Sequence, residues 1–271
     1  MKKQADIHWD PMSTRRYRPP SQLSFAREGL VGFEFGAFLA AERLVATKPP
    51  SDEHPVLVLP GFTASDRSTQ PLRRALKRKG FGAHGWGLGP NVGPHPHVIA
   101  GMERRMDELQ ERYGRKVSII GWSLGGIYAR ELARSRPDQV RSVITLGSPY
   151  RFRQGDHGNS SELYGVVAPQ HDPFDGRALT EEDRPPVPVP TTSIYTMTDG
   201  VVNWHSCIDS ERPQSENIAV MGTHSGLGVN IATLIAIADR LAQPEGEWKP
   251  FRPSVVTRHL FPAATWWRPR E

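Results

Sequence analysis

The 271-residue chain contains a single cysteine, Cys207. One thiol cannot form a disulfide within the chain, so the fold must be held together by a buried core, as in proteins of a reducing compartment. The simplest interpretation of Cys207 is a small core residue.

Long apolar runs are scarce as well. The apolar segment at residues 27–45 is too short for a transmembrane span and contains Glu34. Lys2 and Lys3 are not followed by an apolar run, so the start of the sequence lacks a secretory pattern. We therefore expect a cytoplasmic protein.

The chain is mildly basic, and its charged residues are spread along the sequence. The net charge is +5 at pH 7. No block of aromatic residues alternates with Lys and Arg, so we expect no nucleic-acid partner, although the net charge favours weak attraction to anionic surfaces. The sequence also lacks internal repeats of solenoid or propeller length.

The N-terminal part of the chain divides into two segments. Residues 1–24 are polar, basic and broken by prolines, which predicts an extended arm. Residues 25–47 are expected to form a helix packed on the body of the protein, because Gly29, Gly32 and Gly36 would allow close approach to another element. An amphipathic helix that anchors the protein to a membrane surface is the alternative.

The rest of the chain predicts one main domain and a tail. The length suits a single large core at 48–243. The stretch at about 150–190 is rich in Pro, Gly, His and acidic residues, and we expect it to form a small irregular cap over the site, with a disordered surface insertion as the alternative. In the tail, 244–271, Trp266 and Trp267 could dock on the body or contact a membrane, and the sequence does not decide between them.

Apolar, strand-like runs alternate with helical patterns through the main domain. Strands are expected at 56–59, 81–86, 116–122, 140–146, 192–196 and 217–220. Helices are expected at 69–79, along a stripe from Met102 to Tyr113, at 127–134 and at 230–241. This alternation predicts an α/β fold with a mostly parallel sheet and helices on both of its faces.

One short motif stands between a predicted buried strand and a predicted helix. It reads Gly121-Trp122-Ser123-Leu124-Gly125, which is Gly-x-Ser-x-Gly in the context of a nucleophile elbow. Such a turn strains the serine backbone and raises its hydroxyl above the sheet edge. The flanking glycines are needed because a Cβ would collide with the neighbouring strand or helix. The N–H of Leu124 lies where an oxyanion would form. Ser123 is therefore the candidate nucleophile.

A serine nucleophile needs a histidine base that is oriented by a carboxylate. Asp199 and His224 each follow a later predicted strand, in the order that this architecture uses. A turn residue and a structural histidine are the alternatives for these two positions. The other histidines and acids are less well placed relative to the strand ends: His84, His157, His171, His205, Asp172, Asp175 and Asp209.

The second oxyanion donor is expected from the loop after the first strand, where the N–H of Phe62 follows Pro60-Gly61; a core aromatic is the alternative for Phe62. Trp86, Trp122 and Leu227 are the candidate lining of an apolar substrate pocket.

His95 and His97 alternate with prolines, but no third metal ligand is evident. We interpret both as residues of the pocket rim and expect neither a metal nor an organic cofactor.

Five segments taken together resemble the α/β-hydrolase superfamily, and in particular its bacterial lipase and esterase branch, which includes triacylglycerol-lipase-like and inositol-deacylase-like enzymes. These are Val56 to Phe62, the Ser123 elbow, Thr145 to Pro149, Thr198 to Val202 and Thr223 to Leu227. The resemblance covers about residues 50–243. It implies an acyl-enzyme on Ser123, with His224 as base and then acid and Asp199 orienting His224. Pro60 departs from the pattern, because many relatives carry His there.

These observations predict a serine hydrolase that cleaves small-molecule or lipid esters. A thioesterase, an amidase or an acyltransferase would use the same triad. Two other classes stay open, namely a non-catalytic binding protein on the same scaffold and a basic adaptor in peripheral contact with a membrane. The sequence does not indicate the oligomeric state.

Overall fold

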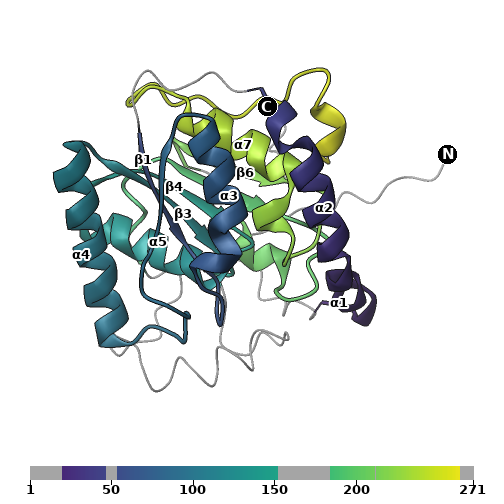
Figure 1. Cartoon of the computed structure of the whole chain (residues 1–271), viewed down its shortest axis with the longest axis horizontal. Coiled ribbons are helices and arrows are strands. Elements are labelled where there is room, and N and C mark those ends of the chain that lie inside the picture. Colours follow the sequence, from purple (N-terminus) through teal and green to yellow (C-terminus); the bar gives the residue numbers. More distant parts are fainter. Residues whose placement is uncertain (1–19, 47–53, 152–183, 211, 263–271) are drawn as a thin grey trace.

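A computed structural model describes residues 20–46, 54–151, 184–210 and 212–262. Six strands form one sheet in the order β2-β1-β3-β4-β5-β6 (Figure 1). Every neighbouring pair is parallel. The strands are β1 (Pro55–Leu59), β2 (Gly82–Gly85), β3 (Val117–Trp122), β4 (Val140–Leu146), β5 (Thr191–Tyr195) and β6 (Ser215–Ala219). The predicted mostly parallel sheet is confirmed.

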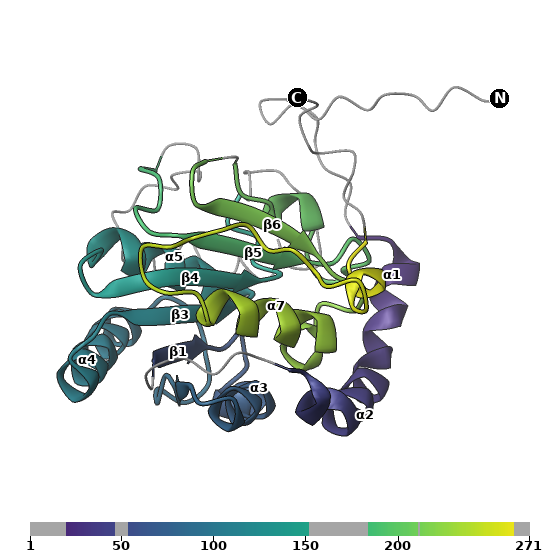
Figure 2. The same cartoon turned by 90° about the horizontal axis from the view of Figure 1, so that it is seen from above.

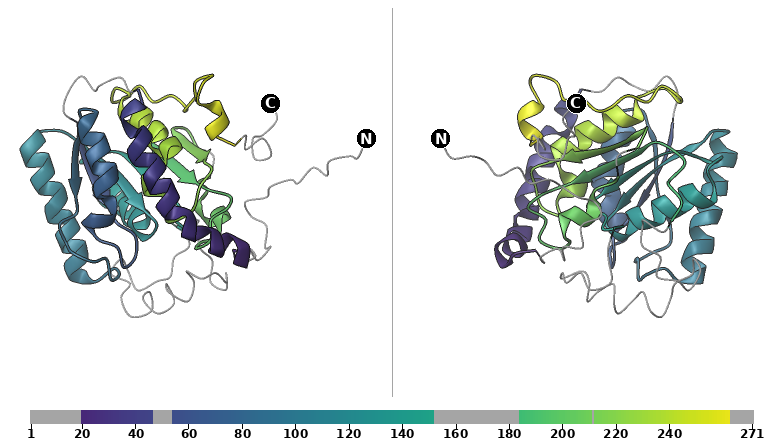
Figure 3. Two further views of the ribbon diagram at one scale, coloured as in Figure 1. Left: turned by 45° about the vertical axis from the view of Figure 1, so that its right-hand side comes forward. Right: turned by 180° about the vertical axis from the view of Figure 1, so that it is seen from behind.

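Helices cover both faces of the sheet, and the strand residues alternate between them. Val56 and Val58 pack in the core under one set of helices, whereas Leu57 and Leu59 pack under the other. The first set is α2 (Val31–Ala41), α3 (Asp66–Arg78) and α7 (Ile231–Leu241). The second set is α4 (Pro96–Tyr113) and α5 (Leu124–Ser135). Helix α4 stands at the left edge of Figure 1, and α5 comes to the front when the molecule is turned round (Figure 3). Both faces are buried, so the central strand β1 reads as a continuous apolar run.

Helices α3 and α4 begin earlier than their apolar stripes suggest. Helix α3 begins at Asp66, because the Ser65 hydroxyl accepts the N–H of Arg67 and caps a polar first turn. Helix α4 begins at Pro96, a residue that suits a first turn, and it ends at Gly114, whose φ of 62° is left-handed. His97 therefore belongs to a helix rather than to the preceding loop.

The N-terminal segment is helical over a range close to the predicted 25–47. It consists of α1 (Gln22–Arg27), η1 (Glu28–Leu30), α2 and η2 (Glu42–Leu44), and it runs along the edge of the molecule (Figure 2). Phe38 joins the core on the α3 and α7 side. The proposed role of the glycines is wrong: a Cβ on Gly29, Gly32 or Gly36 would meet nothing within 4 Å in the described protein, so these glycines do not mediate close packing.

The chain after α7 follows the body as far as it is described. Phe251, Leu260 and Phe261 pack against the core, and Leu260 ends the short helix η7 (Arg258–Leu260). The remaining short helices are η5 (Trp204–Cys207) and η6 (Leu227–Val229). The arm before residue 20, most of the predicted cap and Trp266-Trp267 lie outside the described residues.

Candidate active site

The Gly-x-Ser-x-Gly motif forms a sharp turn between β3 and α5. Ser123 has φ 51° and ψ −119°, a strained conformation for a residue with a side chain. A Cβ on Gly121 would collide with the backbone of Gly125 and Gly126, and one on Gly125 would lie 2.5 Å from the Leu59 carbonyl oxygen. Strand, turn and helix are thus packed backbone to backbone, and this packing holds the strain at Ser123.

His224 and Asp199 are brought together on loops that follow β6 and β5. Nδ1 of His224 lies 2.7 Å from Oδ2 of Asp199, and both residues are buried. The other carboxylate oxygen of Asp199 accepts the N–H groups of Val201 and Val202 at 2.9 and 2.7 Å. Both oxygens of Asp199 are therefore fixed, one on its own turn and the other on the imidazole.

The pKa of His224 is raised above its ordinary value. Burial by itself lowers that pKa, but the charge of Asp199, its hydrogen bond and the charge of Glu28 together outweigh the effect of burial. The imidazolium form of His224 is therefore stabilised, as a base that accepts a proton during a reaction requires.

The His224 loop lies against the Ser123 elbow. The indole N–H of Trp122, next to Ser123, donates to the His224 carbonyl oxygen at 3.2 Å. Across the elbow, the Ser123 N–H donates to the Leu146 carbonyl oxygen at 2.8 Å. A Cβ on the next residue, Gly147, would lie 3.0 Å from Nδ1 of His224, so the imidazole packs directly on that glycine.

The three candidate pocket residues occupy different surroundings. Trp122 is partly buried and packs against Gly228. Leu227 is fully buried beside Gly147, close to His224. Trp86 is buried in the core between the sheet and α4, and its indole N–H donates to the Gly89 carbonyl oxygen at 2.9 Å. A substrate-lining role for these residues stays a prediction.

The loop after β1 runs beside the nucleophile. A Cβ on Gly61 would lie 3.2 Å from that of Ser123, and Thr63 has a positive φ of 59°. The fully buried Asn91 holds this loop: its amide donates to the Pro60 carbonyl oxygen at 2.9 Å, and its backbone oxygen accepts the Thr63 N–H at 2.7 Å. Sequence reasoning missed Asn91, because it lies in a glycine-rich loop without periodicity.

Two carboxylates from the N-terminal helices hold the His224 loop on its other side. Glu28 accepts the backbone N–H groups of Gly200, His224 and Ser225 at 3.0, 2.9 and 2.8 Å. Glu34 accepts the N–H of Thr223 at 3.0 Å and its hydroxyl at 2.6 Å. No local pattern in the sequence indicates these contacts.

The pKa of Glu28 is lowered. Its partial burial raises the pKa, but the hydrogen bonds from Ser225, His224 and Gly200 outweigh that effect. Glu28 is therefore an anion at neutral pH, and it links the turn that carries Asp199 to the turn that carries His224.

The competing acids and histidines have other partners where they are described. Asp209 forms an ion pair with the buried Arg130 at 2.9 Å and with Arg212 at 2.8 Å. Nε2 of His84 lies 2.8 Å from the Tyr113 hydroxyl, and Nδ1 of His205 lies 2.9 Å from the side-chain oxygen of Asn203. His157, His171, Asp172 and Asp175 lie outside the described residues.

The rings of His95 and His97 stack on each other with centroids 5.5 Å apart. Within the described ranges, no group of three or more His, Cys, Asp or Glu is arranged to hold a metal ion.

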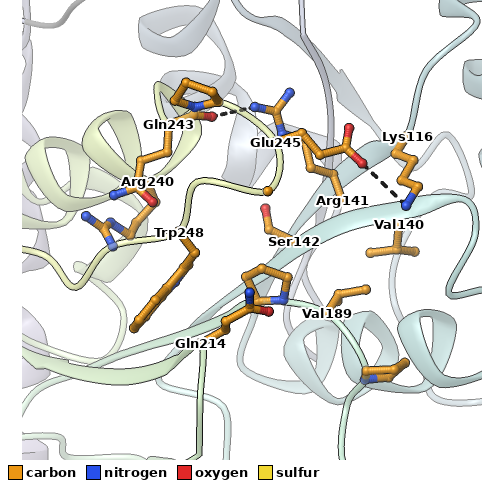
Figure 4. Close-up of a pocket in the computed structure, with 14 residues that line it drawn as sticks. Lys116, Val140, Arg141, Ser142, Val189, Gln214, Arg240, Gln243, Glu245 and Trp248 are labelled. Carbon is orange, nitrogen blue, oxygen red and sulfur yellow. Dashed lines mark hydrogen bonds and ion pairs between the residues drawn. The ribbon is translucent and has the colours of Figure 1, made fainter.

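A pocket between the amino ends of the strands is unsuited to be the active site. It is lined by Val140 at the start of β4 and by Gln214 just before β6, and the pair Lys116–Glu245 spans 3.3 Å beside it (Figure 4). Ser123 follows the carboxyl end of β3, at the opposite edge of the sheet, where parallel α/β sheets bind their ligands. The catalytic candidates and this pocket therefore lie at opposite ends of the strands.

Comparison with known sequences gives short, partial matches. No protein-family model matches the chain. It is 30% identical over 108 residues to a pimeloyl-[acyl-carrier protein] methyl ester esterase of Aromatoleum aromaticum, which covers 31% of this chain and 43% of the relative. It is 33% identical over 109 residues to the biotin biosynthesis bifunctional protein BioHC of Cellvibrio japonicus, which covers 38% of this chain and 20% of the relative. The chain thus matches less than half the length of either relative.

Comparison with solved structures shows the fold. The monoacylglycerol lipase of Paleococcus ferrophilus superposes with a TM-score of 0.50 at 15% identity, covering 73% of this chain and 97% of the lipase. A histidine-to-alanine variant of PytH superposes with a TM-score of 0.50 at 16% identity, covering 71% of this chain and 99% of PytH. The parallel sheet, the elbow after β3 and these similarities show that the chain has the α/β-hydrolase fold.

Proposed function

We propose that the protein is a serine hydrolase that cleaves carboxylic esters through an acyl-enzyme on Ser123. The observation that carries the proposal is the buried His224–Asp199 pair, 2.7 Å apart and packed on Gly147 beside a strained Ser123. A structural histidine or a simple turn aspartate would not need this arrangement at the carboxyl edge of the sheet. Each of the three residues follows a different strand, in the chain order Ser, Asp, His that this fold uses for its triads.

In the proposed reaction, Oγ of Ser123 attacks the ester carbonyl carbon while Nε2 of His224 takes the hydroxyl proton. Asp199 holds Nδ1–H of the imidazole and stabilises the positive charge that develops on the ring. The tetrahedral intermediate then expels the alkoxide, which receives the proton from Nε2. Water, deprotonated by the same nitrogen, attacks the acyl-enzyme, releases the acid and restores the Ser123 hydroxyl.

The N–H groups of Leu124 and Phe62 are the proposed donors to the oxyanion. Leu124 begins α5, so its N–H lies at a helix N-terminus, where the helix dipole favours negative charge. Phe62 follows Gly61, which lies beside Ser123. Asn91 holds the carbonyl of Pro60 and the N–H of Thr63, so it fixes the loop on both sides of Phe62.

An ester is the favoured substrate because the Aromatoleum relative is named as a methyl ester esterase. Thioesters, amides and acyl transfer to another alcohol use the same triad, so the attacking group at deacylation must be measured. The chain length of the acyl group is likewise a matter for experiment.

The test combines a fluorophosphonate probe with hydrolysis of p-nitrophenyl esters of graded chain length. Ser123→Ala and His224→Ala should both abolish labelling and turnover. His205→Ala is the matched control, because it removes a partly buried histidine from η5, which also follows β5. Equal labelling of the wild type and of Ser123→Ala would overturn the proposal, and folded wild type without any labelling would favour a binding protein.

A further inference from the structure

The N-terminal helices turn their apolar side chains outward. Phe33 is 79% exposed and Leu44 is 82% exposed, whereas Phe38 is the only buried residue of α2. We call the exposed side of residues 21–46 the outer face. Its other large apolar side chains are Leu23, Phe25, Leu30, Phe35 and Leu39. Single exposed apolar residues are ordinary, but seven on one short segment mark an interaction surface.

The carboxylates of this segment face the opposite way. Glu28 and Glu34 bind the His224 loop, and the buried Glu42 pairs with Arg78 of α3. The charged side chains that remain exposed on the segment are Arg27 and Arg43, near its two ends. The outer face is therefore apolar and cationic and carries no exposed carboxylate among its described residues.

This combination argues against a second copy of the chain as the occupant. If two outer faces packed antiparallel about a two-fold axis, Arg27 of one copy would approach Arg43 of the other. In a parallel arrangement each arginine would approach its own counterpart. Either arrangement brings like charges together, which is destabilising. The one carboxylate of the described segment within ion-pair distance of these arginines is Glu42, 3.8 Å from Arg43, and it is buried and already paired with Arg78. The charge is complementary instead to an anionic surface with an apolar interior.

We propose that the outer face binds the surface of a phospholipid bilayer that contains anionic headgroups. The apolar side chains enter the boundary between headgroups and acyl chains, and Arg27 and Arg43 contact phosphates. None of the helices in the described ranges is long and apolar enough to cross a membrane, so the segment lies on the surface. Its inner side holds the His224 loop, so the membrane surface lies beside the loop that carries the proposed base.

Binding is measured by cosedimentation with vesicles, using full-length Ser123→Ala protein so that the result does not depend on hydrolysis. The probes are vesicles of phosphatidylcholine alone and vesicles with added phosphatidylglycerol. We expect binding to the anionic vesicles that weakens as salt is added, and much less binding to the neutral ones.

Two double variants and one control locate the surface. Phe33→Ser with Leu44→Ser should weaken binding about tenfold or more, because two large side chains no longer enter the lipid. Arg27→Gln with Arg43→Gln should weaken binding to anionic vesicles about twentyfold, with little effect on neutral ones. Val255→Ser with Val256→Ser removes two side chains of similar exposure, 78% and 79%, outside the outer face and should change little.

Circular dichroism confirms that each variant is folded before binding is compared. Three results would overturn the proposal: no vesicle binding by the folded protein, equal loss of binding in the Val255 and Val256 control, or a dimer in solution that Phe33→Ser with Leu44→Ser dissociates. The last result would assign the outer face to a second copy. If the protein binds vesicles but the folded wild type hydrolyses no ester, this proposal stands and the proposed function does not.

Discussion

The backbone N–H of His224 donates a 2.9 Å hydrogen bond to Oε1 of Glu28, a residue 196 positions earlier in the chain. The same oxygen accepts the N–H of Gly200, which follows Asp199. One carboxylate on the N-terminal helices therefore ties together the two loops that carry the proposed base and its orienting acid. Its charge also contributes to the raised pKa of His224.

Glu28→Gln should change both the activity and its pH dependence. The amide keeps one acceptor oxygen but points an N–H2 group at backbone donors, which should cost about 1–3 kcal/mol in free energy of unfolding. Loss of the negative charge lowers the pKa of His224, so the acid limb of the kcat/KM profile should move to lower pH. The measurement is the pH profile for a soluble p-nitrophenyl ester, together with urea unfolding.

Glu34→Gln is the matched control for Glu28→Gln. Glu34 binds the same loop through Thr223 but is not among the groups that raise the pKa of His224. The variant should lose stability to a similar degree while its acid limb stays in place. An acid limb that moves equally in both variants would show that the charge of Glu28 has no specific effect on His224.

Asn91→Asp should impair catalysis through the loop that carries Phe62. The new carboxylate would face the Pro60 carbonyl oxygen in place of an amide donor and would repel it. If the N–H of Phe62 can then no longer donate a hydrogen bond to the oxyanion, kcat should fall about a hundredfold to a thousandfold, with a smaller change in KM. Steady-state kinetics on a soluble ester measures both constants.

The comparison for Asn91→Asp is Tyr128→Phe. It removes the 3.3 Å hydrogen bond from the Tyr128 hydroxyl to the Asn91 side-chain oxygen but leaves the bond to Pro60 intact. Its kcat should stay close to that of the wild type. A fall in kcat as large as that of Asn91→Asp would indicate a general loss of packing rather than displacement of the loop.

Asp199→Asn tests the orientation of the proposed base. An asparagine oxygen can still accept the N–H groups of Val201 and Val202, so the turn should survive. Its amide would present N–H to Nδ1 of His224 and favour the tautomer that cannot accept the Ser123 proton. We expect kcat to fall by about three to four orders of magnitude at neutral pH, with slower fluorophosphonate labelling and an unchanged far-ultraviolet dichroism spectrum. Activity close to that of the wild type would remove Asp199 from the proposed triad.

The centre of the sheet could be predicted because parallel strands buried on both faces are largely apolar, as β1 is. The run at Val56–Leu59 and the strand before Ser123 differ from the observed bounds by only one residue at one end. The rule that functional residues follow strand ends selects Asp199 and His224 as candidates, and the structure brings their side chains within 2.7 Å of each other. Helix starts were less accurate, as Asp66 shows, because a capped first turn is polar and carries no apolar stripe.

The hydrogen bonds that hold the loops of the candidate site could not be predicted. Glu28 and Glu34 contact residues almost 200 positions away, and Asn91 lies 31 positions from Pro60 in an irregular loop, so no local pattern indicates these contacts. The predicted close packing at the glycines of α2 was wrong for a related reason. A small residue permits close packing, but only the tertiary structure decides whether anything packs there, and at Gly32 and Gly36 nothing in the described protein does.

Asp209→Asn should destabilise the protein far more than a comparable change at the surface. Arg130 is fully buried and forms an ion pair with Asp209, and Asp209 forms a second ion pair with Arg212. Burial alone raises the pKa of Asp209, but the two arginines outweigh that effect and hold the pKa below its ordinary value. Removing the charge leaves Arg130 buried without this carboxylate, which should cost about 3–5 kcal/mol in free energy of unfolding at pH 7.

The same pair gives the stability of the wild type a defined dependence on pH. A carboxyl whose pKa is lowered on folding stabilises the protein above its unfolded pKa of about 3.9, and that contribution disappears as the pH falls through the folded value. The wild type should therefore lose stability below about pH 4 more steeply than Asp209→Asn does. Asp239→Asn serves as the control and should cost less than about 1 kcal/mol, because Asp239 is exposed and its partner Arg240 keeps its ion pair with Glu216. Urea unfolding at pH 7 and at several values below pH 5 compares the three proteins, and equal costs for the two variants at pH 7 would contradict a structural role for the buried pair.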